Sequence, residues 1–357
     1  MISITKVSAI CNLGRNIDEI FNNACIGKLM PHKIDFELPQ IADEKYNLRC
    51  NQLLLELYNQ IKVDVDGAIK KYGKNRVGVV VATTNSGIDE YEDTSNLDHL
   101  KISNPSEYLK DLLGLNSFYG CVSTACTSGV KAFSTAKKLL ENSICDCVIV
   151  AGVDSIAKLP VAGFSALEVL TQTRTNPFSK NRCGMNIGEG AALFILEKNV
   201  DGIKLLGIGE TSDAYNAATP DPEANEAIRA IKIALDDAQL KPEDIDYINL
   251  HGTGTIANDL MEAKAVNLVF GENVYCSSTK PLTGHCLGAA ASIEAALCIK
   301  ALETSIMPPH IFDGEYDNEL PKIKLVSNTN FKAEKMSVCM SSSFGFGGTN
   351  AILILGK

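Results

Sequence analysis

One cysteine with unusually small neighbours is the first candidate for chemistry in this chain. Cys126 stands in the stretch TACTSG, after an extended run at residues 118–123 and before residues 130–141, whose apolar side chains recur at helical spacing. This pattern predicts a strand-to-helix turn with Cys126 at or near the first turn of the helix. The partial positive charge of a helix N-terminus favours a thiolate, so we expect a lowered pKa for this thiol. Cys126 is a candidate nucleophile, and a buried structural cysteine is the alternative that this stretch leaves open.

Two histidines occur in stretches rich in glycine and threonine. His251 ends an apolar run that predicts a strand, and it opens the stretch HGTGT. His285 closes the stretch STKPLTGH, and residues 287–302 after it predict an apolar, alanine-rich helix. A third stretch, SSSFGFGGTN at residues 341–350, predicts a glycine-rich turn between two strands. Each stretch is weak evidence alone, because an isolated histidine is more often structural than catalytic.

The segments that must position these residues alternate between strand and helix character along the whole chain. Strands are predicted at residues 1–11, 77–83, 118–123, 145–153, 191–197, 203–211, 245–250, 274–277, 323–326, 337–340 and 351–355. Helices are predicted from residue 16 or 18 to 26 and at 51–72, 105–115, 130–141, 222–238, 257–269 and 287–302. Residues 85–104 predict a loop with a helical turn. The alternation predicts an α/β fold with parallel or mixed sheets covered by helices.

Composition excludes several classes of function. The chain has 357 residues and a net charge of −10, which disfavours nonspecific binding to nucleic acid. No apolar run is long enough for a transmembrane helix, and the first residues make a poor signal peptide. The twelve cysteines are scattered, without the close pairs of a zinc site or a disulfide framework. These observations predict reduced cysteines in a cytoplasmic protein without a membrane span.

Taken in order, the motifs resemble those of the β-ketoacyl-acyl-carrier-protein synthases of types I and II, the decarboxylating condensing enzymes of the thiolase superfamily. The matching stretches are TACTSG at 124–129, GEGA at 188–191, HGTGT at 251–255, STKPLTGH at 278–285 and SFGFGGTN at 343–350. The resemblance implies the thiolase-like five-layer αβαβα fold with two similar halves. Residues 1–200 would carry the nucleophile, and residues 201–357 the two histidines and the glycine-rich phenylalanine loop.

The resemblance also implies a role for each reacting residue. Cys126 would take the acyl chain as a thioester, in the manner of covalent catalysis. His251 and His285, as neutral N–H donors, would stabilise the enolate formed when a malonyl thioester loses CO₂. The backbone N–H groups of Cys126 and Phe344 would form the oxyanion hole, and Phe344 would gate the acyl pocket. A thiolase-like reaction on acyl-CoA is disfavoured, because the terminal loop carries phenylalanines and no second cysteine.

Supporting residues and partners follow from the same resemblance. Lys280 and Glu294 would form a buried ion pair that holds the region of His285, and Thr253 and Thr255 would bind the phosphopantetheine arm. That arm belongs to an acyl carrier protein, so no metal or redox cofactor is implied. The expected partners are the carrier protein, acyl and malonyl thioesters, and a second copy in a homodimer. Basic side chains that are candidates for carrier docking are Lys45, Arg49 and Lys101.

The region between residues 28 and 117 is shorter than is usual in the family. This leaves an alternative function: an inactive or weakly active chain-length-type subunit of a heterodimeric ketosynthase in a polyketide or aryl-polyene-like pathway. Such a subunit typically lacks the cysteine, whereas this chain keeps the cysteine and both histidines.

Overall fold

Eleven strands form the mixed sheet on which the molecule is built, in a computed structural model that describes residues 1–357. The strand order is β10-β8-β7-β12-β13-β6-β1-β5-β4-β2-β3. The strands before residue 200 are β1 (Ile2–Cys11), β2 (Val77–Ala82), β3 (Tyr119–Val122), β4 (Cys147–Asp154) and β5 (Gly190–Lys198). The later strands of this sheet are β6 (Ile203–Ser212), β7 (Tyr247–Asn249), β8 (Tyr275–Ser277), β10 (Lys324–Leu325), β12 (Val338–Gly345) and β13 (Thr349–Gly356). A separate ribbon pairs β9 (Ile306–Met307) with β11 (Phe331–Lys332).

The sheet divides into two halves at the contact between β1 and β6. Only two residue pairs join these strands, Ser3 with Lys204 and Ile4 with Ile203. All strands before residue 200 lie on one side of this contact, and all strands after residue 203 lie on the other. The boundary that the sequence predicts between residues 200 and 201 falls in the link from β5 to β6.

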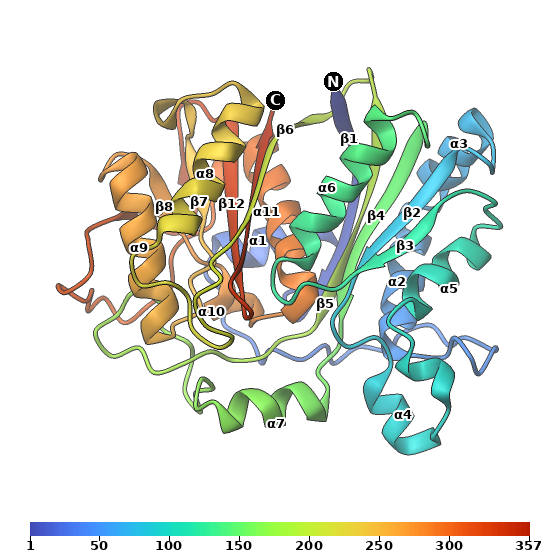
Figure 1. The fold of residues 1–357 in the computed structure, drawn as a ribbon, viewed down its shortest axis with the longest axis horizontal. Helices are drawn as coiled ribbons and strands as arrows, with labels where there is room; N and C mark the ends of the chain where they lie inside the picture. The colour runs from blue at the N-terminus through green and yellow to red at the C-terminus, as the bar shows by residue number, and fades with distance from the viewer.

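Helices cover both faces of each half-sheet and produce the five-layer αβαβα arrangement that we expected (Figure 1). The middle layer contains α6 (Ser128–Glu141) and α11 (Ala290–Thr304), with α1 (Ile17–Cys25) beside α11. The outer layers contain α2 (Arg49–Gln60), α3 (Lys62–Tyr72) and α5 (Asn104–Leu112) on the N-terminal half, and α8 (Asn225–Ala238) and α9 (Ile256–Phe270) on the C-terminal half. Strands covered on both faces are apolar, as β2 is throughout and β4 is up to its last residue, Asp154.

The two middle helices pack unusually closely because small residues line their contact. A Cβ added to Gly129 of α6 would lie 2.8 Å from the Cβ of Ala291 in α11. A Cβ added to Gly152 of β4 would lie 2.2 Å from the Oγ of Ser292. Larger side chains at these positions would push α11 away from α6 and β4. The helix that follows Cys126 and the helix that follows His285 therefore lie directly against each other.

Three local predictions are corrected by the structure. The predicted helix at 51–72 is two helices, α2 and α3, which separate at Ile61 (φ −124°, ψ 26°). Its apolar spacing continues across the break, so periodicity alone could not reveal it. The segment predicted as a glycine-rich turn forms strand up to Gly345, and only residues 346–348 make the turn. Helices not predicted are α4 (Ile88–Thr94), α7 (Lys158–Ala166) and α10 (Lys280–Thr283).

None of the helices combines the length and apolar character needed to cross a bilayer. All twelve cysteines are unpaired, as their scattered spacing predicted.

Candidate active site

The predicted strand-to-helix turn is present between β3 and α6. Ala125 has a φ of +53°, in the left-handed region that non-glycine residues rarely adopt. The turn is held by short hydrogen bonds: the Ser128 hydroxyl donates to the carbonyl of Ala125 (2.6 Å) and accepts from the N–H of Thr124 (2.8 Å). Cys126 follows this tight turn, and α6 begins two residues later. The backbone conformation therefore places the thiol beside the N-terminus of α6, facing the centre of the molecule.

Cys126, His251 and His285 come together, although up to 159 residues separate them in the chain. The His285 Nε2 lies 3.0 Å from the Cys126 Sγ. The two imidazole rings meet edge to face with their centroids 5.3 Å apart. All three side chains are buried, with exposed fractions of 1–4%. The C-terminal half supplies both histidines, one after β7 and one after α10, and the N-terminal half supplies the thiol.

The hydrogen bonds behind the two rings assign their tautomers. The Nδ1 of His285 accepts from the backbone N–H of Leu287 at 3.1 Å. The Nδ1 of His251 lies 3.3 Å from the Lys280 ammonium, which can only donate. A neutral imidazole that accepts at Nδ1 carries its proton on Nε2. Burial lowers the pKa of both histidines well below the usual value, and the Lys280 charge lowers both further. The site therefore holds two neutral rings whose Nε2–H groups face the thiol.

Lys280 is fully buried and makes three contacts with its ammonium group. Besides the Nδ1 of His251, it donates to the carbonyl oxygen of His251 (2.5 Å) and to the Oε1 of Glu294 (2.5 Å). The side chains of Lys280 and Glu294 are 1% and 3% exposed. Burial raises the pKa of Glu294 even with this partner. The expected ion pair is thus present, but the histidine that the ammonium contacts directly is His251.

The thiol pKa differs from the sequence expectation. Burial raises the pKa of Cys126 to about 11, although the Lys280 charge and the N–H groups of Phe346 and of Cys126 itself act in the opposite direction. Desolvation of the buried thiol outweighs the effect of the helix N-terminus on its pKa, so the expected lowering of the pKa is wrong. The resting pair is a neutral thiol beside a neutral imidazole.

The glycine-rich hairpin contributes two phenylalanines with different surroundings. The backbone N–H of Phe346 lowers the pKa of the Cys126 thiol, and the Phe346 ring packs on Phe164 of α7 with centroids 5.3 Å apart. Phe344 lies in the β12–β13 ladder opposite Asn350, and its ring meets His251 edge to face at 6.0 Å. The N–H group that acts on the thiol, besides that of Cys126 itself, therefore belongs to Phe346 and not to Phe344. Phe344 lies inside β12, which extends five residues beyond its predicted end at residue 340.

A cavity of about 270 Å³ leads from the surface to the three reacting residues. Thr253 and Thr255 line its wall, with their hydroxyl oxygens 2.9 Å apart. Two hydrogen bonds join the β12–β13 hairpin to the loop after β6. The N–H of Asp213 donates to the carbonyl of Gly348 (2.7 Å), and the N–H of Gly347 donates to the carbonyl of Ala217 (2.8 Å). These two loops are bonded into one unit at the entrance.

Two buried carboxylates that sequence reasoning missed support the site. Glu262 of α9 accepts the backbone N–H groups of His251 and Gly252, each at 2.7 Å, and burial raises its pKa to about 8. Asp154 accepts hydrogen bonds at the end of β4. The available signal for Glu262 was an acidic residue among apolar positions of the helix, at Leu260-Met261-Glu262-Ala263. Asp154 follows an apolar strand directly, but its partners lie far away in the sequence.

The reacting cluster has the spacing of a metal site but not its surroundings. The donor atoms of Cys126, His251 and His285 lie within 4.8 Å of one another. A histidine that binds a metal usually donates its other ring N–H to an acceptor. Here both rings accept at that position, and a buried ammonium lies 3.3 Å from one of them. This arrangement favours N–H donation into the cavity over coordination of a cation.

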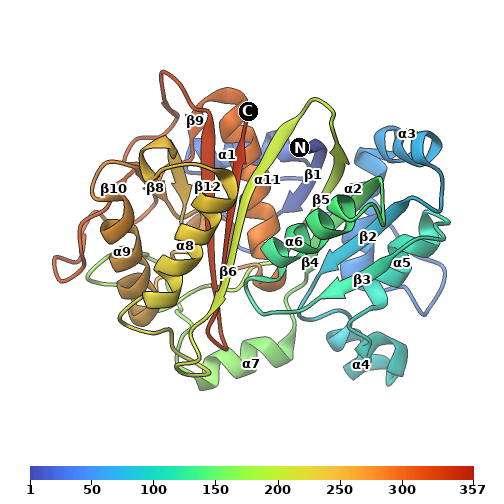
Figure 2. The ribbon, with the colours of Figure 1, turned by 45° about the horizontal axis from the view of Figure 1, so that its top comes forward.

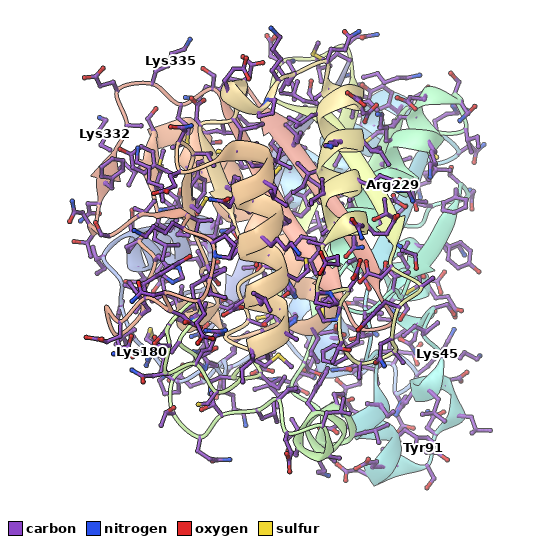
Figure 3. The ribbon with its side chains drawn as sticks, turned by 60° about the vertical axis from the view of Figure 1, so that its left-hand side comes forward. Lys45, Tyr91, Lys180, Arg229, Lys332 and Lys335 are labelled. Carbon is purple, nitrogen blue, oxygen red and sulfur yellow. The ribbon has the colours of Figure 1, made fainter.

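The three candidates for carrier docking are already paired within the chain. Arg49 makes a bidentate contact with the buried Glu189, with both N–O distances 2.7 Å. Lys45 lies 3.3 Å from Glu107, and Lys101 lies 2.5 Å from Asp98. Figure 3 labels Lys45 at the surface. Arg49 serves chiefly to neutralise a buried carboxylate, whereas Lys45 and Lys101 are partly exposed.

Comparisons with known proteins agree with this geometry. Residues 49–201 match the model for the N-terminal domain of beta-ketoacyl synthase, and residues 203–312 match the model for its C-terminal domain. The 3-oxoacyl-[acyl-carrier-protein] synthase 2 of Coxiella burnetii is 32% identical over 99% of this chain and 98% of its own length.

Solved structures extend the likeness to three dimensions. The ketosynthase ApeO from Xenorhabdus doucetiae, solved with its chain length factor ApeC, gives a TM-score of 0.93 at 37% identity and covers 99% of this chain and 97% of its own. The ishigamide ketosynthase/chain length factor gives a TM-score of 0.90 at 25% identity, over 100% of this chain and 98% of its own. The fold and the cysteine with two histidines define a condensing enzyme of the thiolase-like class. Within that class, the chain belongs to the β-ketoacyl synthase family.

Proposed function

We propose that this protein is a β-ketoacyl-acyl-carrier-protein synthase. It transfers an acyl chain from a carrier to Cys126 and then condenses it with malonyl carrier protein, with loss of CO₂, in chain elongation of the fatty-acid or polyketide type. The observation that supports this best is the thiol of Cys126 facing two neutral imidazoles, whose Nε2–H groups point into the same buried cavity.

In the first half-reaction the Cys126 sulphur attacks the thioester carbonyl of the acyl carrier. The new S–C bond forms first, and the bond to the pantetheine sulphur then breaks. The thiol proton ends on the released carrier thiol. The N–H groups of Cys126 and Phe346 are placed to stabilise the oxyanion that forms between these events. Because the pKa of Cys126 is about 11, the proton must leave as the substrate arrives.

In the second half-reaction the malonyl thioester loses CO₂, and negative charge develops on its thioester oxygen. Donors that already point at this position need no reorganisation, which is the main source of electrostatic catalysis. The Nε2–H groups of His251 and His285 are such donors, and neither ring needs to be charged. The enolate carbon then attacks the acyl carbonyl, and the Cys126 thiolate leaves and regains a proton. The product is a β-ketoacyl carrier that is two carbons longer.

The pantetheine arm is a substrate here, carried in by the acyl carrier protein. The cavity is lined by the bonded loops, by the hydroxyl groups of Thr253 and Thr255 and by the reacting cluster. These hydroxyls suit the amides of an extended pantetheine chain. We assign no resident metal or redox cofactor to the reaction, since every step described uses side chains of this protein.

A second chain of the same fold is the partner that we expect beside α7. Figures 1 and 2 show α7 at the lower edge of the molecule, apart from the layered helices. No residue of this largely apolar helix is buried, and Leu159 is 56% exposed. A homodimer would cover it with a second copy. A heterodimer would cover it with a related chain, and this chain, which keeps Cys126, would be the catalytic subunit.

Acyl transfer to Cys126 can be tested by intact mass spectrometry. The protein is incubated with carrier proteins that bear acetyl, medium-chain or aryl acyl groups. We expect a mass gain of one acyl group in the wild type and none in Cys126→Ala. Cys183→Ala is the matched control, because Cys183 is exposed and lines the same cavity, and it should be acylated like the wild type. Lack of acylation by every starter would favour the chain-length-type subunit instead.

A further inference from the structure

Asp154, the last residue of β4, is a fully buried carboxylate outside the reacting cluster. Its Oδ1 accepts from the hydroxyl of Thr83 (2.7 Å) and the N–H of Asn85 (2.9 Å). Its Oδ2 accepts from the hydroxyl of Thr84 (2.7 Å) and the N–H of Gly288 (2.6 Å). The N–H of Thr84 lies between the two oxygens, at 2.9 and 3.1 Å. Backbone N–H groups only donate, so the carboxylate must present acceptors on both sides.

The partners of Asp154 belong to two segments that support the active site from behind, one in each half of the chain. Thr83 follows β2, and its N–H donates to the carbonyl of Val122 (3.2 Å) in β3, the strand that leads to Cys126. Gly288 lies three residues after His285. One carboxylate therefore joins the strand before the nucleophile to the turn after the histidine.

The turn that follows His285 has a constrained backbone. Leu287 has a φ of +50°, a left-handed conformation that a leucine rarely adopts. Its N–H donates to the Nδ1 of His285 (3.1 Å), and this bond places the ring proton on Nε2. The next N–H, that of Gly288, donates to Asp154. A Cβ at Gly288 would lie 2.7 Å from the Oδ2 of Asp154. The turn therefore packs directly against the carboxylate, without room for a side chain at residue 288.

We propose that Asp154 is a positioning residue for His285. By accepting the Gly288 N–H, it holds the turn in the conformation that directs the Leu287 N–H at the His285 Nδ1. It thereby selects the tautomer whose Nε2–H faces Cys126 and the cavity. Its effect on catalysis rests on the proposed function, whereas its effect on the tautomer does not.

The test compares two substitutions at the same carboxylate. Asp154→Asn keeps the shape but turns one acceptor into an NH₂ group, which opposes the N–H donors. Thr83→Val removes the hydrogen bond to the Oδ1 on the side away from the turn, together with the acceptor of the Ser86 N–H (3.1 Å), and is the matched control. If Asp154→Asn does not fold, Gly288→Ala replaces it, because its Cβ displaces the same turn and leaves the carboxylate intact.

The first readout is the ¹⁵N spectrum of the protein labelled at histidine, which needs no substrate. The chain has five histidines, and the signals of His285 are assigned by their loss in His285→Ala. We expect a single Nε2–H tautomer of His285 in the wild type and in Thr83→Val. Asp154→Asn, or Gly288→Ala in its place, should show a mixture with the Nδ1–H form. An unchanged Nε2–H tautomer in the variant used would overturn the proposal.

The second readout separates positioning from general structural support. In the steady state, misplacement of one N–H donor should lower kcat of Asp154→Asn by about 10- to 100-fold with little change in KM. Acyl loading of Cys126, measured on the same samples, should stay near the wild-type rate. Equal losses of kcat in Asp154→Asn and Thr83→Val would also overturn the proposal. If the wild type itself neither loads nor condenses, the proposed function fails, while the tautomer result still decides the role of Asp154.

Discussion

Replacing Lys280 by methionine would leave the carboxylate of Glu294 buried without its partner. Coulomb's law gives about 7 kcal/mol for unit charges 2.5 Å apart at an effective dielectric constant near 20. The penalty cannot reach that value, because the carboxyl can take up a proton instead. Neutralising a carboxyl whose ordinary pKa is 4.5 costs about 3.4 kcal/mol at pH 7, at 1.36 kcal/mol for each pH unit. Since burial already raises the pKa of Glu294 in the wild type, this value is a ceiling, and we expect the variant to lose up to about 3 kcal/mol of unfolding free energy at pH 7.

This reasoning also fixes how the loss depends on pH. In the variant, Glu294 stays protonated when folded and ionises when unfolded, so its folded pKa lies above its unfolded value. The stability is then fully present below pH 4.5 and falls as pH rises, by about 1.4 kcal/mol per unit. At pH 5 the loss should be below about 1 kcal/mol. Glu262, with a pKa of about 8, stays protonated between pH 5 and 7 in both proteins and does not contribute to the difference.

Urea unfolding of the wild type, Lys280→Met and the double variant Lys280→Met/Glu294→Gln, at pH 5, 6 and 7, measures these values. Glutamine has no charge to neutralise, so the double variant should lose the pH-dependent part. A difference between single variant and wild type that is constant from pH 5 to 7 would refute the argument. So would a double variant with the same pH slope as the single one.

Three further outcomes follow from the site. In Glu262→Gln an NH₂ group would face one of the two N–H groups that Glu262 accepts, those of His251 and Gly252. We therefore expect a loss of about 1–3 kcal/mol of unfolding free energy in urea, and an unchanged midpoint would contradict the assigned bonds. Phe346→Ala keeps the backbone N–H, so acyl loading followed by mass spectrometry should stay within about tenfold of the wild type. Gly345→Ala adds a Cβ 3.2 Å from the Cys126 N–H and should slow loading about 10²-fold; equal rates in these two variants would argue against the N–H assignment. Because the pKa of Cys126 is about 11, its alkylation by iodoacetamide should rise about tenfold per pH unit between pH 7 and 9, and a plateau below pH 8 would show a lower pKa.

The sequence predicted the layered α/β fold and the meeting of Cys126, His251 and His285. Apolar periodicity gave the alternation of strands and helices, whereas the five layers and the meeting of the three residues were implied by the resemblance of the ordered motifs to the condensing enzymes. The sequence analysis did not predict the tight packing of α11 on α6, which small residues such as Gly129 permit.

Other features depend on distances in space that no local pattern reports. The helix break at Ile61 keeps the apolar spacing on both sides. The end of β12 lies five residues later than predicted, so that Phe344 belongs to the strand and Phe346 to the turn. The raised pKa of Cys126 depends on how completely the pocket excludes water, and that depends on elements from both halves. Asp154 acts through Thr83, which follows β2, and Gly288, which precedes α11, and only the folded chain brings these residues together.

A single-turnover reaction tests the central claim most directly. The protein, first acylated on Cys126, is mixed with malonyl carrier protein, and the masses of both proteins are followed. The account predicts that the acyl group leaves Cys126 as CO₂ is released, and that the carrier gains the acyl chain joined to a two-carbon unit. An acyl group that stays on Cys126 beside unchanged malonyl carrier protein would contradict it.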